Sequence, residues 1–201
     1  MAIVLVGHGD AEQSRASLEL QVSQPWTAAM LPQAVSPDDA FDPTDLTYFL
    51  DNDAVNCSVV MFAPSGAIFA AQSLPRFSDL LLTNRAALIA YGDIALTGND
   101  GRTWPAFFPA FDYERFLEQG YAASCFALRR ETVMSVMTKR PTTLFRLFNS
   151  VLDEGGPQVS NRVLHLPGVS AAIPMIDLAS SRTQLARATK AHLDALGIPA
   201  D

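Results

Sequence analysis

Apolar runs of strand length alternate with amphipathic stretches along the chain. Strands are predicted at 2–6, 27–31, 57–63, 86–95, 122–128 and 162–166, and the continuous apolar runs at 2–6 and 57–63 predict buried ones. Helices are predicted by apolar spacing and terminal signals at 11–23, 78–84, 112–118, 131–137, 142–152 and 180–196. Residues 46–50 form a weaker element, and 32–45, rich in Pro, Asp and Ser, predicts a loop. This alternation predicts an α/β domain with a mostly parallel central sheet flanked by helices, and we expect residues 1–201 to form one domain.

Composition narrows the classes of partner. Of the 201 residues, 49% are hydrophobic and only 17% charged, which suggests that a protein partner, an oligomer contact or further chain covers some apolar surface. The net charge of -7, with no clustered basic face along the chain, argues against binding to nucleic acid or an anionic membrane.

Targeting signals and cysteines point to the cytoplasm. No apolar run reaches transmembrane length, so we expect no membrane insertion. The opening MAIVLVGHGD lacks a basic flank and is interpreted as a first strand, not a signal peptide. Two cysteines are too few for a disulfide framework, and Cys125, in an apolar run, is expected to be a buried thiol.

The most informative segment is 91–130, YGDIALTGNDGRTWPAFFPAFDYERFLEQGYAASCFALRR. It predicts a strand ending in an acid, a turn, a crossing segment rich in proline and aromatic residues, a short helix and a second strand. Its marker residues are Asp93, Gly101, Phe107, Pro109, Phe111, Gln119, Tyr121, Arg129 and Arg130. In this order and spacing, the segment resembles the acceptor-side half of an inverting family-two glycosyltransferase.

Further segments extend the resemblance over nearly the whole chain. IVLVGHGDAEQSRASLELQVSQ is similar to the opening strand, base-binding turn and first helix of that family, while RVLHLPGVSAAIP and QLARATKAHLDALGI are similar to its closing strand and trailing helix. The resemblance implies a GT-A fold, which is Rossmann-like, with a nucleotide-sugar site. It implies donor contacts at His8, Gly9, Asp10 and Asp93, and an acceptor groove at Phe111, Gln119 and Tyr121.

The family's acidic motifs are missing at three places. AAMLPQAV has no acid where the family contacts uridine. Ala63-Pro64-Ser65-Gly66 replaces the Asp-x-Asp motif, whose carboxylates hold a divalent metal. Arg140-Pro141-Thr142 offers no carboxylate where the family carries its catalytic base. We therefore assign no catalytic residue and no metal ligand, and interpret the chain as degenerate at its metal, donor and base motifs.

Structural roles compete with the functional ones. Asp93 is favoured as a strand-end acid that caps the next turn, His8 is equally well explained as an exposed turn histidine, and Phe111 and Tyr121 as core residues. His165 and His192 are expected to be structural. The one compact carboxylate pair with Asp-x-Asp spacing, at 51–53, precedes its strand and is expected to be a loop feature.

Two functions are open. The first is a degenerate glycosyltransferase-like domain that acts in binding or assembly within a glycan-synthesis system. The second is an active nucleotide-sugar-dependent glycosyltransferase that transfers a sugar to a hydroxyl acceptor, and only this function implies a divalent metal, Mg²⁺ or Mn²⁺. In both, a nucleotide-sugar or a glycan is the expected ligand. The three missing motifs favour the first.

Overall fold

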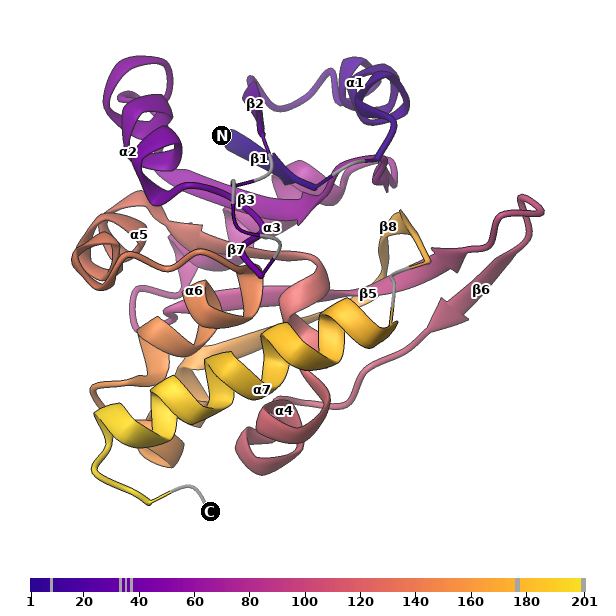
Figure 1. Ribbon diagram of the computed structural model, residues 1–201. Coiled ribbons are helices and arrows are strands. Elements are labelled where there is room, and N and C mark those ends of the chain that lie inside the picture. Colours follow the sequence, from indigo (N-terminus) through magenta and orange to yellow (C-terminus); the bar gives the residue numbers. More distant parts are fainter. Residues whose placement is uncertain (8, 33, 35, 37, 176–177, 200–201) are drawn as a thin grey trace.

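The computed structural model describes residues 1–7, 9–32, 34, 36, 38–175 and 178–199, with the backbone alone at 178–179 (Figure 1). Within these residues the strands form an eight-stranded sheet in the order β2-β1-β3-β7-β5-β8-β4, with β6 paired to β5. The strands are β1 (Ala2–Val6), β2 (Thr27–Leu31), β3 (Val59–Pro64), β4 (Ile68–Phe69), β5 (Ile89–Thr97), β6 (Thr103–Ala106), β7 (Phe126–Arg129) and β8 (Val163–Pro174).

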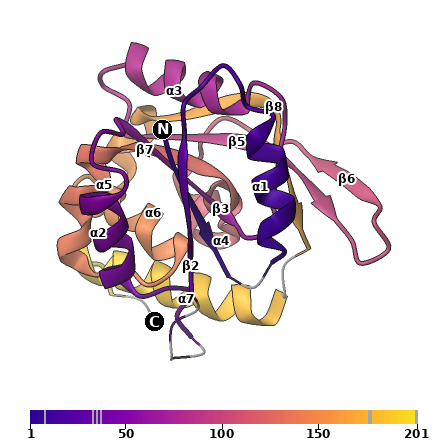
Figure 2. The ribbon, with the colours of Figure 1, turned by 90° about the horizontal axis from the view of Figure 1, so that it is seen from above.

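Strand direction confirms the predicted mostly parallel sheet. β2, β1 and β3 are mutually parallel, and so are β5 and β8. The short β7 is antiparallel to both β3 and β5, so these two groups point the same way. The antiparallel β4 and β6 pair with β8 and β5. The β5–β6 hairpin extends away from the helices in both Figure 1 and Figure 2.

The helices cover both faces of this sheet. They are α1 (Ala11–Glu19), α2 (Pro43–Asn52), α3 (Ser73–Thr83), α4 (Tyr113–Gln119), α5 (Arg130–Val136), α6 (Leu144–Leu152) and α7 (Leu178–Ala195), with 3-10 turns η1 (Tyr121–Ser124), η2 (Met137–Lys139) and η3 (Gly156–Arg162). The face packed by α1 and α3 has one core cluster, and the face packed by α2, α4, α5 and α6 has the other. α7 packs on α4 and α6 as an outer layer (Figure 1).

Alternation along β1 shows how the sequence builds the two cores. Ala2, Val4 and Val6 point to the α2–α6 side, whereas Ile3 and Leu5 point to the α1–α3 side. Because successive side chains of a strand face opposite ways, a strand covered by helices on both faces must be apolar throughout. The predicted strands at 2–6 and 27–31 are both confirmed residue for residue, although β2, at the edge of the sheet, is only partly buried.

Helix boundaries differ from expectation where local signals compete. The weak element at 46–50 is part of α2, which begins earlier because Asp42 caps it by accepting from the Thr44 amide at 2.8 Å. α3 begins at Ser73 despite Pro75, since proline is tolerated in a first helical turn. The last helix, predicted to begin at residue 180, already begins at Leu178, so Ser180 and Ser181 lie inside it.

Strand boundaries shift for related reasons. Residues 122–124, predicted as the start of a strand, belong to η1, and β7 begins only at Phe126. β8 continues to Pro174 because Pro167 and Gly168 sit in a bulge, where the register against β5 shifts and proline costs no ladder hydrogen bond. Cys125 is buried as expected, and burial raises the pKa of its thiol to about 12. Among the described residues, no helix combines the length and apolar character needed to cross a bilayer.

Candidate functional site

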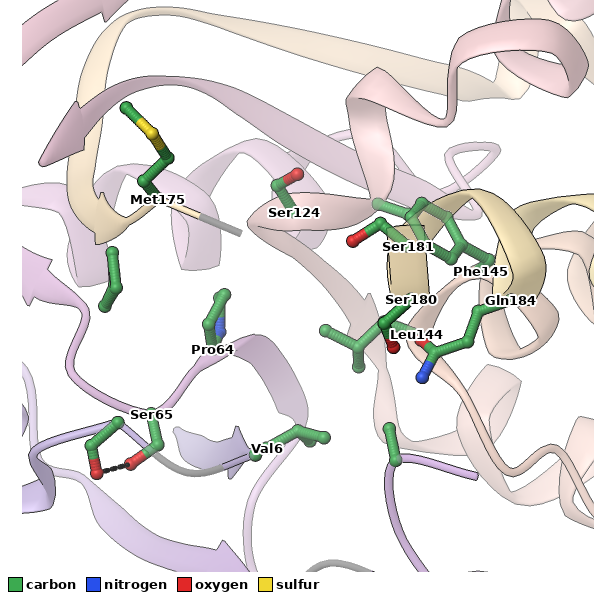
Figure 3. A pocket seen from close by; sticks show the side chains of 15 residues that line it. Val6, Pro64, Ser65, Ser124, Leu144, Phe145, Met175, Ser180, Ser181 and Gln184 are labelled. Atoms are coloured by element: carbon green, nitrogen blue, oxygen red, sulfur yellow. Dashed lines mark hydrogen bonds between the residues drawn. The ribbon is translucent and has the colours of Figure 1, made fainter. Parts of the chain in front are cut away.

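A pocket opens where the strand order reverses. From β1 the chain moves to β2 on one side and then to β3 on the other, and open α/β sheets place ligands at such a switch point, outside the carboxyl ends of the strands. The pocket has a volume of about 420 Å³ (Figure 3). It is lined by Val6, Gly7, Gly9, Ala40, Pro64, Ser65, Ala123, Ser124, Leu144, Phe145, Pro174, Met175, Ser180, Ser181 and Gln184.

The floor of the pocket consists of two turns bonded to each other. The Ser65 amide donates to the Val6 carbonyl at 2.8 Å, and the Ser65 hydroxyl donates to the Gly9 carbonyl at 3.0 Å (Figure 3). A Cβ at Gly9 would lie 1.6 Å from the Ser65 carbonyl oxygen. Gly9, predicted to contact a donor, is therefore required in any case by the close approach of the two turns.

The far wall comes from η1, α6 and α7, whose chain positions are well separated from β1. Thr143 caps α6 by accepting from the Arg146 amide at 3.1 Å, which fixes Leu144 and Phe145 at the pocket edge. Figure 3 shows Ser180, Ser181 and Gln184 of α7 beside these two residues. The polar side chains of the lining are hydroxyls and one amide, which suit hydrogen bonding to uncharged groups.

The lining does not fit a metal-bound diphosphate. Among the described residues that line the pocket, no side chain is charged. Mg²⁺ and Mn²⁺ prefer oxygen ligands that include carboxylates, and the position after β3 carries Pro64 and Ser65 instead. Across the part of the chain that the structure describes, no group of three or more His, Cys, Asp and Glu residues is placed to hold a metal.

Asp93, the acid predicted to contact the donor, lies away from this lining and is 3% exposed. Its carboxylate accepts from the Phe108 amide at 2.8 Å, the Gly168 amide at 2.7 Å and the His165 ring at 2.8 Å. Burial by itself raises the pKa of Asp93, but these bonds outweigh it and hold the pKa below its ordinary value. Asp93 thus joins the base of the hairpin to the bulge of β8, and no observation tests whether it also contacts a donor.

Two of the other predicted donor residues, Gly9 and Asp10, lie between β1 and α1. Asp10 is exposed and caps α1 by accepting from the Glu12 amide at 3.0 Å. His8 lies outside the described residues. Three of the predicted donor contacts, Gly9, Asp10 and Asp93, are among the described residues, and of these three Gly9 alone lines the pocket. Donor binding by this set stays a prediction.

The predicted acceptor residues lie on the α4 side and not in the pocket lining. Phe111 and Tyr121 both pack edge-on to Tyr91 in the aromatic core, and the Tyr121 hydroxyl accepts from the Asp112 amide at 3.0 Å. Gln119 is exposed at the end of α4 and accepts from the Arg115 side chain at 3.1 Å. Their part in acceptor binding stays a prediction.

A charged cluster beneath α7 was not anticipated from the sequence. The Asp153 carboxylate accepts hydrogen bonds from both terminal nitrogens of Arg146, at 3.1 and 2.8 Å, and from the His192 ring nitrogen Nδ1, at 2.7 Å. Lys139 lies 3.2 Å from the same carboxylate, and the second nitrogen of His192 meets the Tyr113 hydroxyl at 2.7 Å. His192, expected to be partly buried, is completely buried. The cluster fastens α7, and with it one wall of the pocket, to α4 and α6.

Comparisons with known proteins agree on the fold. No protein-family model and no curated protein matches the sequence. The structure is similar to glucosyl-3-phosphoglycerate synthase from Mycobacterium tuberculosis in complex with Mn²⁺, UDP and glucosyl-3-phosphoglycerate, at 12% identity and a TM-score of 0.58 over 100% of this chain and 81% of that one. The complex of that synthase with Mn²⁺, UDP-glucose and phosphoglyceric acid gives 14% identity and 0.58 over 100% and 80%. The chain therefore has the GT-A glycosyltransferase fold that its sequence resemblance implied.

Proposed function

We propose that this chain is a catalytically degenerate GT-A domain that acts by binding, or in assembly, within a glycan-synthesis system. We also infer that residues 1–201 fold as one unit. The observation that carries the proposal is the uncharged lining of the pocket at the switch point. A nucleoside diphosphate brings several negative charges, and burying them without cations or a metal costs more than the hydrogen bonds of serines return.

A second candidate is an active nucleotide-sugar-dependent glycosyltransferase, with a pocket that holds the donor and a base that deprotonates a hydroxyl acceptor. What favours it is that the similar structures are complexes of a synthase with UDP or UDP-glucose, and they match this chain over its full length. The two candidates differ in one measurable property, which is dependence on a divalent metal.

Titration calorimetry with uridine, guanosine and thymidine diphosphates, each with and without Mn²⁺, separates the candidates. For a degenerate domain, we expect no micromolar binding of any diphosphate, and an affinity that changes less than about twofold on adding Mn²⁺. Micromolar binding that requires Mn²⁺ would overturn the proposal and support the active enzyme.

A matched pair of variants tests whether an observed ligand binds in this pocket. Ser181→Trp puts an indole into the pocket wall, whereas Ala186→Trp puts the same side chain on an exposed position of the same helix, outside the pocket lining. A ligand of the pocket should lose at least about tenfold in affinity with the first variant and keep it with the second. Equal effects would place the ligand elsewhere.

A further inference from the structure

A second concave site lies at the opposite end of the sheet. The pocket described above lies at the carboxyl end of β3. This groove lies at the other end of the same strand and is formed by Cys57 and Ser58, which precede Val59, together with the end of β7 and the carboxyl end of α3. Its volume is about 690 Å³, and its lining is Cys57, Ser58, Leu82, Arg85, Arg129, Arg130 and Glu131. Although the sequence showed no clustered basic face, the fold brings three arginines together here.

Arg129 is a fixed cation without a carboxylate partner among the described residues. One terminal nitrogen donates to the Arg85 and Ala87 carbonyls at 3.0 and 2.7 Å. The other donates to the carbonyls of Asn84, at 2.8 Å, and Leu81 at the end of α3. Carbonyl dipoles orient the guanidinium and stabilise it near a helix C-terminus, but they do not neutralise its charge.

Arg130 and Arg85 leave donors unused. Arg130 donates through one terminal nitrogen to the Leu50 carbonyl and the Asp51 carboxylate, each at 3.0 Å, while its Nε is buried without a hydrogen-bond acceptor. The exposed Arg85 guanidinium has no hydrogen-bond or ion-pair partner within the described ranges. The groove thus holds three guanidiniums against one paired carboxylate, Asp51, and the carboxylate of the exposed Glu131.

We propose that this groove binds an oxyanion, the phosphate or carboxylate group of a ligand. Guanidinium groups present planar pairs of N–H donors that match these anions. Arg129, whose terminal nitrogens already donate to four carbonyls, contributes a fixed positive charge, and Arg130 contributes its charge and its remaining terminal nitrogen. Arg85, which makes no competing bond, closes on the anion. The site is independent of the GT-A pocket and of whether that pocket is active.

Cys57 provides a reporter inside the groove. It lines the site and is half-buried, whereas Cys125 is 1% exposed, so iodoacetamide should alkylate Cys57 alone in the folded protein. We expect inorganic phosphate, pyrophosphate or a penta-glutamate peptide to slow this alkylation in a saturable way at constant ionic strength. Protection by the phosphates would identify phosphate as the anion, and protection by the peptide alone would identify carboxylate.

Two arginine variants test the assignment. Arg85→Gln should raise the apparent dissociation constant of the protecting anion about fivefold, the effect of losing one exposed charge contact. Arg102→Gln removes the same charge from the hairpin, where Arg102 is 80% exposed beside Asp100, and should leave the constant unchanged. Equal effects of both variants, or no protection beyond that of matched sodium chloride, would overturn the proposal. Unchanged urea unfolding of Arg85→Gln would show that the fold is intact.

Discussion

The Asp153 cluster offers the sharpest test of what holds α7 in place. Its carboxylate, 4% exposed, meets Arg146, Lys139 and His192, which are 18%, 28% and 0% exposed at their side chains. Asp153→Asn keeps the size of the side chain but removes its charge. After this change water can partly hydrate Arg146 and Lys139, which are partly exposed, but it cannot reach the buried ring of His192. Removing one partner from a buried charge cluster costs about 3–5 kcal/mol. We therefore expect Asp153→Asn to lower the free energy of unfolding by about 3 kcal/mol, the low end of this range.

Urea unfolding at pH 7 measures this loss. Asp51→Asn is the matched control, because its carboxylate also lies 3.0 Å from an arginine, Arg130, but is 51% exposed. An exposed pair contributes about 0–1 kcal/mol, so the control should lose no more than that. A loss below about 1 kcal/mol in Asp153→Asn, or equal losses in both variants, would refute the view that the cluster anchors α7.

The same cluster predicts a pH dependence with a definite sign. Burial by itself raises the pKa of Asp153, but the hydrogen bonds and charges of His192 and Arg146 outweigh it and hold the pKa well below the ordinary 3.8. The stabilisation is therefore complete above about pH 4 and is lost as the pH falls through the lower, folded-state pKa. Asp153→Asn should consequently flatten the acid limb of the stability curve, and a variant with an unchanged acid limb would contradict this assignment.

Two further substitutions test the scaffold around the pocket. Gly9→Ala should lower the unfolding free energy by about 2 kcal/mol or more, because its Cβ would overlap the Ser65 carbonyl. Gly101→Ala has nothing within 4 Å of its Cβ and should show only the smaller penalty of its positive φ. Urea unfolding measures both variants. Asp93→Asn should cost about 1–3 kcal/mol by weakening three hydrogen bonds. The loss should shrink as the pH falls below about 4, because the unfolded chain, in which Asp93 has its ordinary pKa, takes up a proton before the folded protein does. If the unfolding free energy of Gly9→Ala or of Asp93→Asn lay within about 0.3 kcal/mol of the parent value, the role assigned to that residue would be contradicted.

Most elements could be predicted because their signals are local. β1 and β2 match the predicted ranges in full: β1 is buried on both faces and apolar at every position, whereas β2 is a partly buried edge strand that is apolar after Thr27. β6 was missed because the hairpin strand Thr103–Ala106 is largely exposed and carries no apolar alternation. The length of β8 was missed because a proline normally ends a strand, and only the bulge at its pairing with β5 accommodates Pro167.

The candidate sites were less predictable than the fold. Gly9, which lines the pocket, was named because the turn after the first strand resembles the base-binding turn of family-two glycosyltransferases. Ser124, Phe145 and Gln184 were missed. Phe145 and Gln184 lie in ordinary helices and Ser124 in a 3-10 turn that was predicted as strand, and their neighbours in sequence give no sign of a pocket. The charge cluster was missed for the same reason, since Tyr113 and His192 meet across 79 positions of sequence.

The sequence by itself determined the order of the strands and helices other than β4 and β6, the resemblance to GT-A glycosyltransferases and the loss of acids at three motif positions. These follow from patterns within a few residues, where the periods of helix and strand operate. Only the tertiary structure decided that serines, a glutamine and apolar side chains from seven parts of the chain form one uncharged pocket, and that three arginines share a groove at the opposite end of the sheet. Such sites depend on which distant segments pack together, and no local period encodes that.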